Sequence, residues 1–225
     1  VAQLPIGIDG LTGSKNQAQV RETELIEALN LTYEDFTLQK EGGSAKYNST
    51  AITGAPTIVG GWDWYPTEGT QRMVVVTSAG AMLKDTGGAD FTVTLASGLT
   101  ATTNTIAHFS EGGKEAAAND RKLFICTRDN QVRVLAADGA TVAALATPPT
   151  DWGTSYPSFM FNHEGRMWGG GNSNDPHRLY YSMTTNHESF TGSGSGTISV
   201  FPGEGERIVC ALPLKGLIVV FKHPN

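Results

Sequence analysis

Residues 72–76 of the chain read RMVVV, an apolar strand that follows a polar turn, and the same pattern returns three times. The later copies are RKLFIC at 121–126, GRMW at 165–168 and KGLIVVF at 215–221. Their first large apolar residues lie 50, 44 and 50 residues apart, and they are Met73, Leu123, Met167 and Leu217. A repeat of this length with several short strands in each copy is typical of a β-propeller or another array of repeated sheets. The sequence therefore predicts an all-β chain of β-propeller-like, repeated antiparallel sheets.

Short apolar runs alternate with turns that contain Gly, Asn or Asp along most of the chain, which is the pattern of β-hairpins. We expect three four-stranded sheets and the beginning of a fourth. The expected strands are 57–65, 72–77, 81–84 and 91–95, then 105–109, 122–127, 131–135 and 141–145, then 158–162, 166–169, 177–182 and 196–201, then 207–212 and 217–221. Two prolines at 148–149, followed by Asp151-Trp152-Gly153, mark the connection between the second sheet and the third.

Residues 1–50 follow a different pattern, and we predict an extended N-terminal arm with the first strands there, ahead of a propeller-like domain at 51–225. Residues 1–20 show no strong periodicity. Residues 23–31 suit a short helical turn capped by Thr23, while 29–33 and 35–44 suit strands. A propeller closes a ring of four to eight blades. The chain holds little more than three repeats, so we expect it to be the N-terminal portion of a longer protein.

The bulk composition limits the classes of function. The chain has 16 Lys and Arg against 22 Asp and Glu, a net charge of −6. This charge argues against a protein that binds nucleic acid through its overall surface. Cys126 and Cys210 lie in separate apolar strands, which favours two buried thiols, although a disulfide between equivalent strands stays open. No apolar run approaches the roughly 18 residues that a membrane span needs, and the N-terminus lacks a signal-peptide pattern.

Three histidines, His163, His177 and His187, lie near Asp175 and Glu188 in the sequence and form the cluster that most resembles metal ligands. Their spacings of 14 and 10 residues match no short zinc motif, and no cysteine accompanies them. His163 also lies in an expected turn, where polar residues are usual. We therefore predict neither a metal site nor a cofactor.

Paired carboxylates beside aromatic platforms would indicate glycosidase chemistry. Asp63 lies between Trp62 and Trp64, and Tyr65 and Glu68 follow, so a sugar could stack on this segment. Such aromatic residues are more often the packed edge of a sheet, where tryptophan buries a large apolar area, and the Ser-x-Asp-x-Gly-x-Thr-Trp repeat of sialidase propellers is absent from the sequence. A carbohydrate-binding or carbohydrate-hydrolysing propeller is the alternative function, and a cellular propeller scaffold is a second alternative.

Nucleophilic catalysis needs a Ser or Cys held beside a base. The run GSGSG at 192–196 is not a nucleophile elbow, because nothing helical follows it. The run GGGNSN at 169–174 lacks the Lys and the following helix of a phosphate-binding loop. We interpret 191–196 and 169–176 as mobile loops and predict no catalytic residue, so we expect that the protein is not an enzyme.

The segment 161–181 reads FNHEGRMWGGGNSNDPHRLYY and is followed by Ser182. After it come GEGERI at 203–208 and LIVVFK at 217–222, and before it come ELIEALNLT at 24–32 and KEGGS at 40–44. Together these segments resemble virion proteins of tailed bacteriophages, in particular tail-tube or head-to-tail junction proteins with β-propeller-like domains. The shared pattern is a Gly turn, an Arg-Leu-Trp-like strand, a polar loop ending in Asp-Pro and a strand ending in Tyr-Tyr-Ser.

This resemblance implies a structural component of the virion, in the tail or at the head–tail junction, that assembles as a ring around the DNA exit path. The implied partners are further copies of the chain, other tail or connector proteins, and DNA that contacts the lumen passively. The acidic balance suits such a channel, because a strongly basic wall would hold DNA through counterion release. The family supplies no contact or catalytic residue. We expect the arm at 1–20 and the two loops to reach neighbouring subunits.

Overall fold

The computed structural model describes residues 31–34, 37–40, 47–67, 70–85, 87, 90–113, 121–203 and 205–224. The chain divides into two compact units, residues 1–46 and 47–225. In the first unit, β1 (Leu31–Glu34) and β2 (Thr37–Lys40) pair as an antiparallel hairpin. The predicted arm at 1–20 and the helical turn that begins at Thr23 lie outside the described residues.

The described residues of the second unit form three four-stranded antiparallel sheets and one two-stranded sheet, each made of strands that are consecutive in the chain. The first sheet consists of β3 (Ile58–Thr67), β4 (Thr70–Thr77), β5 (Met82–Lys84) and β6 (Val93–Ala96). The second consists of β7 (His108–Gly112), β8 (Lys122–Cys126), β9 (Arg133–Leu135) and β10 (Val142–Ala144). The third consists of β11 (Phe159–His163), β12 (Arg166–Gly170), β13 (Arg178–Tyr181) and β14 (Gly196–Ser199). The two-stranded sheet pairs β15 (Glu206–Leu214) with β16 (Leu217–Pro224).

Local sequence explains both the strands and their turns. In β4, Val74 and Val76 face the second sheet while Val75 faces the other way, and all three are buried, so this strand is apolar throughout. The β9–β10 turn is fastened by Asp138, whose carboxylate accepts hydrogen bonds from the amides of Ala140 and Thr141 at 2.8 and 2.9 Å. With the hydroxyl of Thr141, these bonds lower the pKa of Asp138 to about 2.

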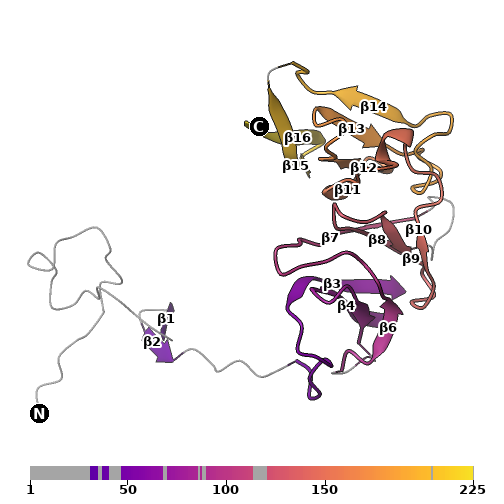
Figure 1. Cartoon of the computed structure of the whole chain (residues 1–225). Helices are drawn as coiled ribbons and strands as arrows, with labels where there is room; N and C mark the ends of the chain where they lie inside the picture. The colour runs from indigo at the N-terminus through magenta and orange to yellow at the C-terminus, as the bar shows by residue number, and fades with distance from the viewer. Residues whose placement is uncertain are drawn as a thin grey trace, which may run out of the picture. The chain divides into compact units, whose positions relative to one another are not determined.

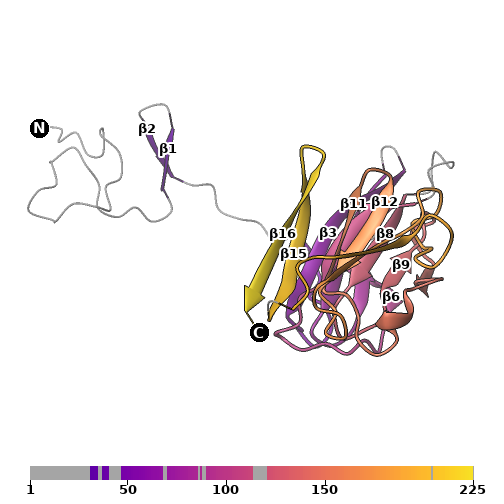
Figure 2. The same ribbon diagram turned by 90° about the horizontal axis from the view of Figure 1, so that it is seen from above.

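The sheets stack face against face in chain order, from the first sheet to the β15–β16 hairpin (Figure 1). The first strands of successive sheets are neighbours, because β7 contacts both β3 and β11, and β11 contacts β15. Backbone and side-chain bonds join them: the Ala107 amide donates to the Val59 carbonyl, and the Asn162 side chain donates to the Glu111 carbonyl. From above, the sheets overlie one another and β15–β16 lies along one side of the unit (Figure 2).

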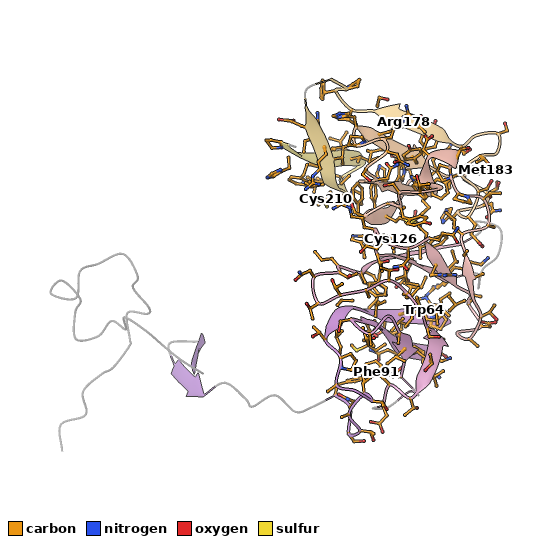
Figure 3. The ribbon with its side chains drawn as sticks, in the orientation of Figure 1. Trp64, Phe91, Cys126, Arg178, Met183 and Cys210 are labelled. Atoms are coloured by element: carbon orange, nitrogen blue, oxygen red, sulfur yellow. The ribbon has the colours of Figure 1, made fainter. Side chains whose placement is uncertain are left out.

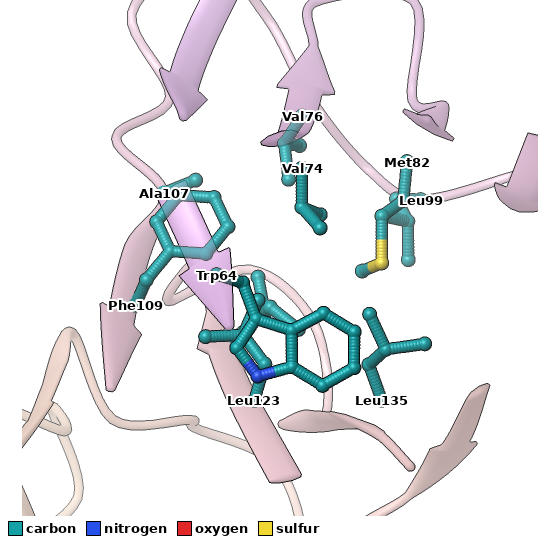
Figure 4. Packing of buried hydrophobic residues seen from close by; sticks show 10 residues of the cluster. Trp64, Val74, Val76, Met82, Leu99, Ala107, Phe109, Leu123 and Leu135 are labelled. Atoms are coloured by element: carbon teal, nitrogen blue, oxygen red, sulfur yellow. The ribbon is translucent and has the colours of Figure 1, made fainter. Parts of the chain in front are cut away.

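Three apolar layers fill the spaces between the sheets. In the first layer, the fully buried Trp64 packs with Leu123 and Leu135 of the second sheet (Figure 4). The second layer holds Phe124 and Met167 between the second and third sheets. The third layer joins the third sheet to β15–β16, and its members are Phe159, Phe161, Trp168, Leu179, Ile208 and Ala211. Each sheet is therefore held mainly by its immediate neighbours in the stack.

The prediction of an all-β chain is confirmed, and the expected strands of the second unit agree with the observed ones in order and grouping. The connection at 148–153 contains a short 3₁₀ turn, η2 (Thr150–Trp152), and Trp152 is buried. None of the described sheets closes on itself. Among the described residues, no helix is long and apolar enough to cross a membrane.

Candidate functional site

The β15–β16 hairpin is set by its turn and its pairing. Lys215 and Gly216 have φ angles of 47° and 79°, the pair of left-handed residues that a two-residue hairpin turn requires. From this turn the register pairs Leu214 with Leu217 and Leu212 with Val219. After Ala211, the register continues through Cys210 and Phe221 and then shifts at Val209, where β15 bulges.

One face of this hairpin packs on the third sheet. Ile208 and Ala211 of β15 are buried there against Phe161 and Trp168, and Ile218 and Val220 are packed beside them. Side chains in a strand alternate between two faces. The residues between these buried positions must therefore point away from the stack.

The opposite face is apolar and largely exposed. Cross-strand partners in register share a face, which places six residues together in what we call the open face: Cys210, Leu212, Leu214, Leu217, Val219 and Phe221. Four of them are strongly exposed, with 40% of Leu212, 53% of Leu214, 69% of Leu217 and 49% of Phe221 accessible. Within the described part of the chain, no hydrophobic cluster includes these four residues. Contiguous exposed apolar surface of this kind marks interaction sites.

The edge of the hairpin is also free. In the first three sheets, a third strand pairs with the second, whereas among the described residues β16 pairs with β15 alone. The free strand carries the uncharged run LIVVF at 217–221. An exposed edge without Lys, Glu or Pro in its centre is a template for another strand.

The other end of the stack differs from the open face. The outer face of the first sheet is covered in part, because Val75, Leu83 and Phe91 form a cluster there with Ile52 packed against it. The hydroxyl of Tyr47 donates to the carboxylate of Asp85 at 2.6 Å, which raises the tyrosine pKa to about 12. Residues that precede β3 and β6 thus cover part of this end of the stack.

The histidines singled out as candidate metal ligands are not brought together. His187 is buried, and its ring accepts a hydrogen bond from the Gly113 amide. His163 lies near Glu164, with 3.9 Å between Nε2 and Oε1. Glu188 pairs with Lys122, and Asp175 pairs with Arg178. In the described residues, no group of three or more His, Cys, Asp or Glu side chains is placed to hold a metal ion.

The three aromatic residues of the candidate sugar-binding segment, Trp62, Trp64 and Tyr65, do not lie together. One is in the core and the other two lie on opposite faces of β3. Trp64 is fully buried in the first apolar layer. Trp62 is partly exposed, stacks on Phe109 and donates its indole N–H to Glu111 at 2.9 Å. Tyr65 lies on the other face of β3, where its hydroxyl donates to Asp63 at 3.2 Å. The three aromatic rings therefore form no common platform, and Glu68 lies outside the described residues.

The expected loops 169–176 and 191–196 overlapped the expected strands 166–169 and 196–201 at Gly169 and Gly196, where the strands are observed, and the loop interpretation is also wrong at Gly170. Gly169 and Gly170 lie in β12 and Gly196 begins β14. A side chain at Gly169 would lie 2.9 Å from the Trp152 ring, so the strand needs glycine for close packing. Residues 171–176 and 191–195 do form turns between strands.

A charged cluster that sequence reasoning missed joins η2 to β13. The guanidinium of Arg178 contacts Asp151 at 3.0 Å and Asp175 at 2.7 Å, and the hydroxyl of Tyr180 donates to Asp151 at 3.0 Å. Burial, with the carboxylates beside it, raises the pKa of Tyr180. Every charge here has a partner, so the cluster fastens the connection between two sheets.

No protein-family model matches this chain, and no curated protein matches it. The candidate site is therefore assigned from the geometry of the open face.

Proposed function

We propose that this chain is a structural component of a tailed-phage virion, in the tail or at the head–tail junction, whose stacked sheets are part of a propeller-like ring. The observation that carries the proposal is the open face, an apolar surface bordered by the free edge of β16. The resemblance of 161–181 and 217–222 to such virion proteins supports the same role. A scaffold that binds other subunits needs a surface of this kind and needs no catalytic residue.

The occupant that we propose for the open face is a second copy of this chain. The two ends of the stack are unlike, since one is apolar and largely exposed and the other carries the half-exposed Tyr47 and Tyr65. A contact between unlike ends is heterologous, and repeated heterologous contacts close into a ring when the rotation permits. Aromatic residues are enriched at protein interfaces. The two tyrosines therefore suit the receiving end of the next copy.

A ring of such copies would let DNA pass through its lumen. Each copy carries a net charge of −6, and proteins that hold DNA tightly do so with clustered Lys and Arg that release counterions. An acidic ring repels the phosphate backbone instead. The proposal therefore includes weak, passive contact with DNA.

Light scattering after size-exclusion chromatography tests the self-assembly. We expect the wild-type protein to form oligomers whose average mass rises with protein concentration. A double variant that combines Leu212→Asn and Phe221→Ser should form none. The control is Ile198→Asn, which removes an exposed apolar side chain from the outer strand β14 and should leave the oligomer intact. A wild-type monomer at every concentration, or an oligomer that survives the paired substitution, would refute the proposed contact.

Electron microscopy tests the virion role separately. Particles from the biological source should show this chain in the wall of a tail or connector, as a ring of copies around a central channel. Detection of the chain only as a free protein outside particles would overturn the virion role, whatever its oligomeric state.

A further inference from the structure

A cavity of about 750 Å³ lies at one end of the second and third sheets and the β15–β16 hairpin. Its walls come from the starts of β7, β11 and β15 and from the β8–β9 and β12–β13 turns. The volume lies in the range of ligand sites in proteins. The cavity is distinct from the open face, although Cys210 borders both.

Asn172 is the residue that most directly indicates a ligand-binding role for this cavity. It lines the cavity and is 1% exposed, and among the described residues neither its Oδ1 nor its Nδ2 has a hydrogen-bond partner. A buried amide without partners is unfavourable, because the loss of its hydration is not compensated by a hydrogen bond. An amide held in this way can both donate to and accept from one bound group.

Backbone geometry brings Asn172 to this position. The preceding residue, Gly171, has a φ of 78°, and a Cβ there would lie 2.1 Å from the Ser158 hydroxyl. Only glycine therefore fits between β11 and the β12–β13 turn. On the other side, Ser173 is fixed because its amide donates to the Ser155 hydroxyl at 2.7 Å.

Two arginines give the cavity its charge. Arg128 comes from the β8–β9 turn and Arg207 from β15, and Asp129 is the one acidic residue among the lining residues. Neither guanidinium has a hydrogen bond or an ion pair with another described residue. The turn that carries Arg128 is rigid, because the side chain of Asn130 bonds the backbone of Thr100 at 2.8 and 2.9 Å. Guanidinium groups without partners favour carboxylate ligands.

We infer that this cavity binds an extended acidic peptide segment, with Arg128 and Arg207 holding its carboxylates and Asn172 pairing with a peptide amide. A peptide unit offers one donor and one acceptor, which is what the Asn172 amide lacks. Apolar wall residues such as Ile208 and Val209 suit the aliphatic part of a peptide. A sugar acid fits less well, because neither Trp nor Tyr is among the described lining residues to stack on a ring.

Fluorescence anisotropy with a labelled peptide tests this inference, which does not rest on the proposed function. The probe is a hexapeptide of alternating Gly and Glu, and its matched control carries Gln in place of Glu. We expect saturable binding of the Glu peptide, weaker binding in high salt, and at least tenfold lower affinity for the Gln peptide. Equal binding of the two peptides, or no binding of the Glu peptide, would overturn the inference.

Variants locate the site. Arg207→Gln and Asn172→Ala should each weaken binding about tenfold or more, while Arg121→Gln, an exposed arginine outside the cavity, should leave it unchanged. Asn172→Ala should not lower the unfolding midpoint, because the amide makes no bond in the free protein; a structural role would lower it. Displacement of the peptide by free glutarate at equal concentration would contradict a peptide ligand. So would tighter binding of oligogalacturonate than of the Glu peptide.

Discussion

His187, in the segment between β13 and β14, accepts a hydrogen bond from the amide of Gly113 at 3.0 Å, just beyond the end of β7. The other ring nitrogen, Nε2, lies 3.0 Å from the carbonyl of Gly165 in the β11–β12 turn. One imidazole thus bridges the second and third sheets. A Cβ on Gly112 would lie 2.6 Å from the same ring, so the chain approaches His187 closely at this point.

The substitution His187→Ala should therefore destabilise the second unit by about 1–3 kcal/mol, because it removes a buried ring and takes that partner from the part-buried Gly113 amide and Gly165 carbonyl. Urea unfolding followed by tryptophan fluorescence measures the change. The matched control is His223→Ala, at an exposed position near the end of β16, which should change the unfolding free energy by less than about 0.5 kcal/mol. Equal effects of the two substitutions would show that the bridge contributes nothing.

Trp62 and Trp64 should respond very differently to truncation. Trp64→Ala removes a fully buried ring from the first apolar layer, and such changes cost about 3–5 kcal/mol. Trp62→Ala removes a half-exposed ring and one bond to Glu111, at a cost of about 1 kcal/mol. Thermal unfolding of both variants, compared with wild type, checks the order. A larger loss for Trp62→Ala would contradict the packing described for β3.

The two cysteines should differ in reactivity. Cys126 is buried inside the stack, and burial raises the pKa of its thiol, whereas Cys210 is half-buried at the β15–β16 end (Figure 3). Thiolates react and thiols do not. A thiol reagent should therefore label Cys210 in native protein and label Cys126 only after unfolding, as mass spectrometry of tryptic peptides would show.

Labelling of Cys210 also reports on the open face, because Cys210 is paired with Phe221 there. The labelling rate of Cys210 should fall as the protein concentration rises. In the double variant Leu212→Asn and Phe221→Ser, the rate should no longer depend on protein concentration. A rate that is independent of concentration in wild type, alongside oligomers in solution, would place the subunit contact elsewhere.

His108 should make stability depend on pH. Burial lowers its pKa in the folded state, so between the folded value and the unfolded value of about 6.5 the unfolded chain binds more protons. The stability that neutral His108 contributes is therefore fully present above about pH 6.5 and is lost as pH falls below it. Nδ1 of the His108 ring also accepts a hydrogen bond from the Met160 amide, and protonation of Nδ1 would break this bond.

Urea unfolding from pH 8 to pH 5 measures this effect, with His108→Gln as the comparison. The variant keeps an acceptor for Met160 and cannot titrate, so its stability should fall less steeply with decreasing pH. Identical slopes for the two proteins would assign the pH dependence to other groups.

The strands could be predicted from sequence because local signals decide them. Turns such as 137–139 and 215–216 combine Gly with Asp or Lys, and each is flanked by short apolar runs. Pairing between consecutive strands then follows without long-range information. The open face could have been found in the same way, since Cys210, Leu212 and Leu214 alternate along β15.

The cavity could not be predicted, because its residues come from distant parts of the chain. Arg128, Asn172 and Arg207 belong to three sheets and share no local motif. The strand position of Gly170 was missed for a related reason. Gly170 is packed closely against Leu179 and Phe159 of the neighbouring strands, and a run of glycines indicates a loop when those contacts are unknown.

The pairing of each strand with its neighbour in the chain has a consequence for synthesis. A sheet whose four strands follow one another is complete as soon as its last strand has left the ribosome. The apolar side of each folded sheet is then available for the next sheet to pack on. The sheets can therefore fold one after another, in the order in which they are translated.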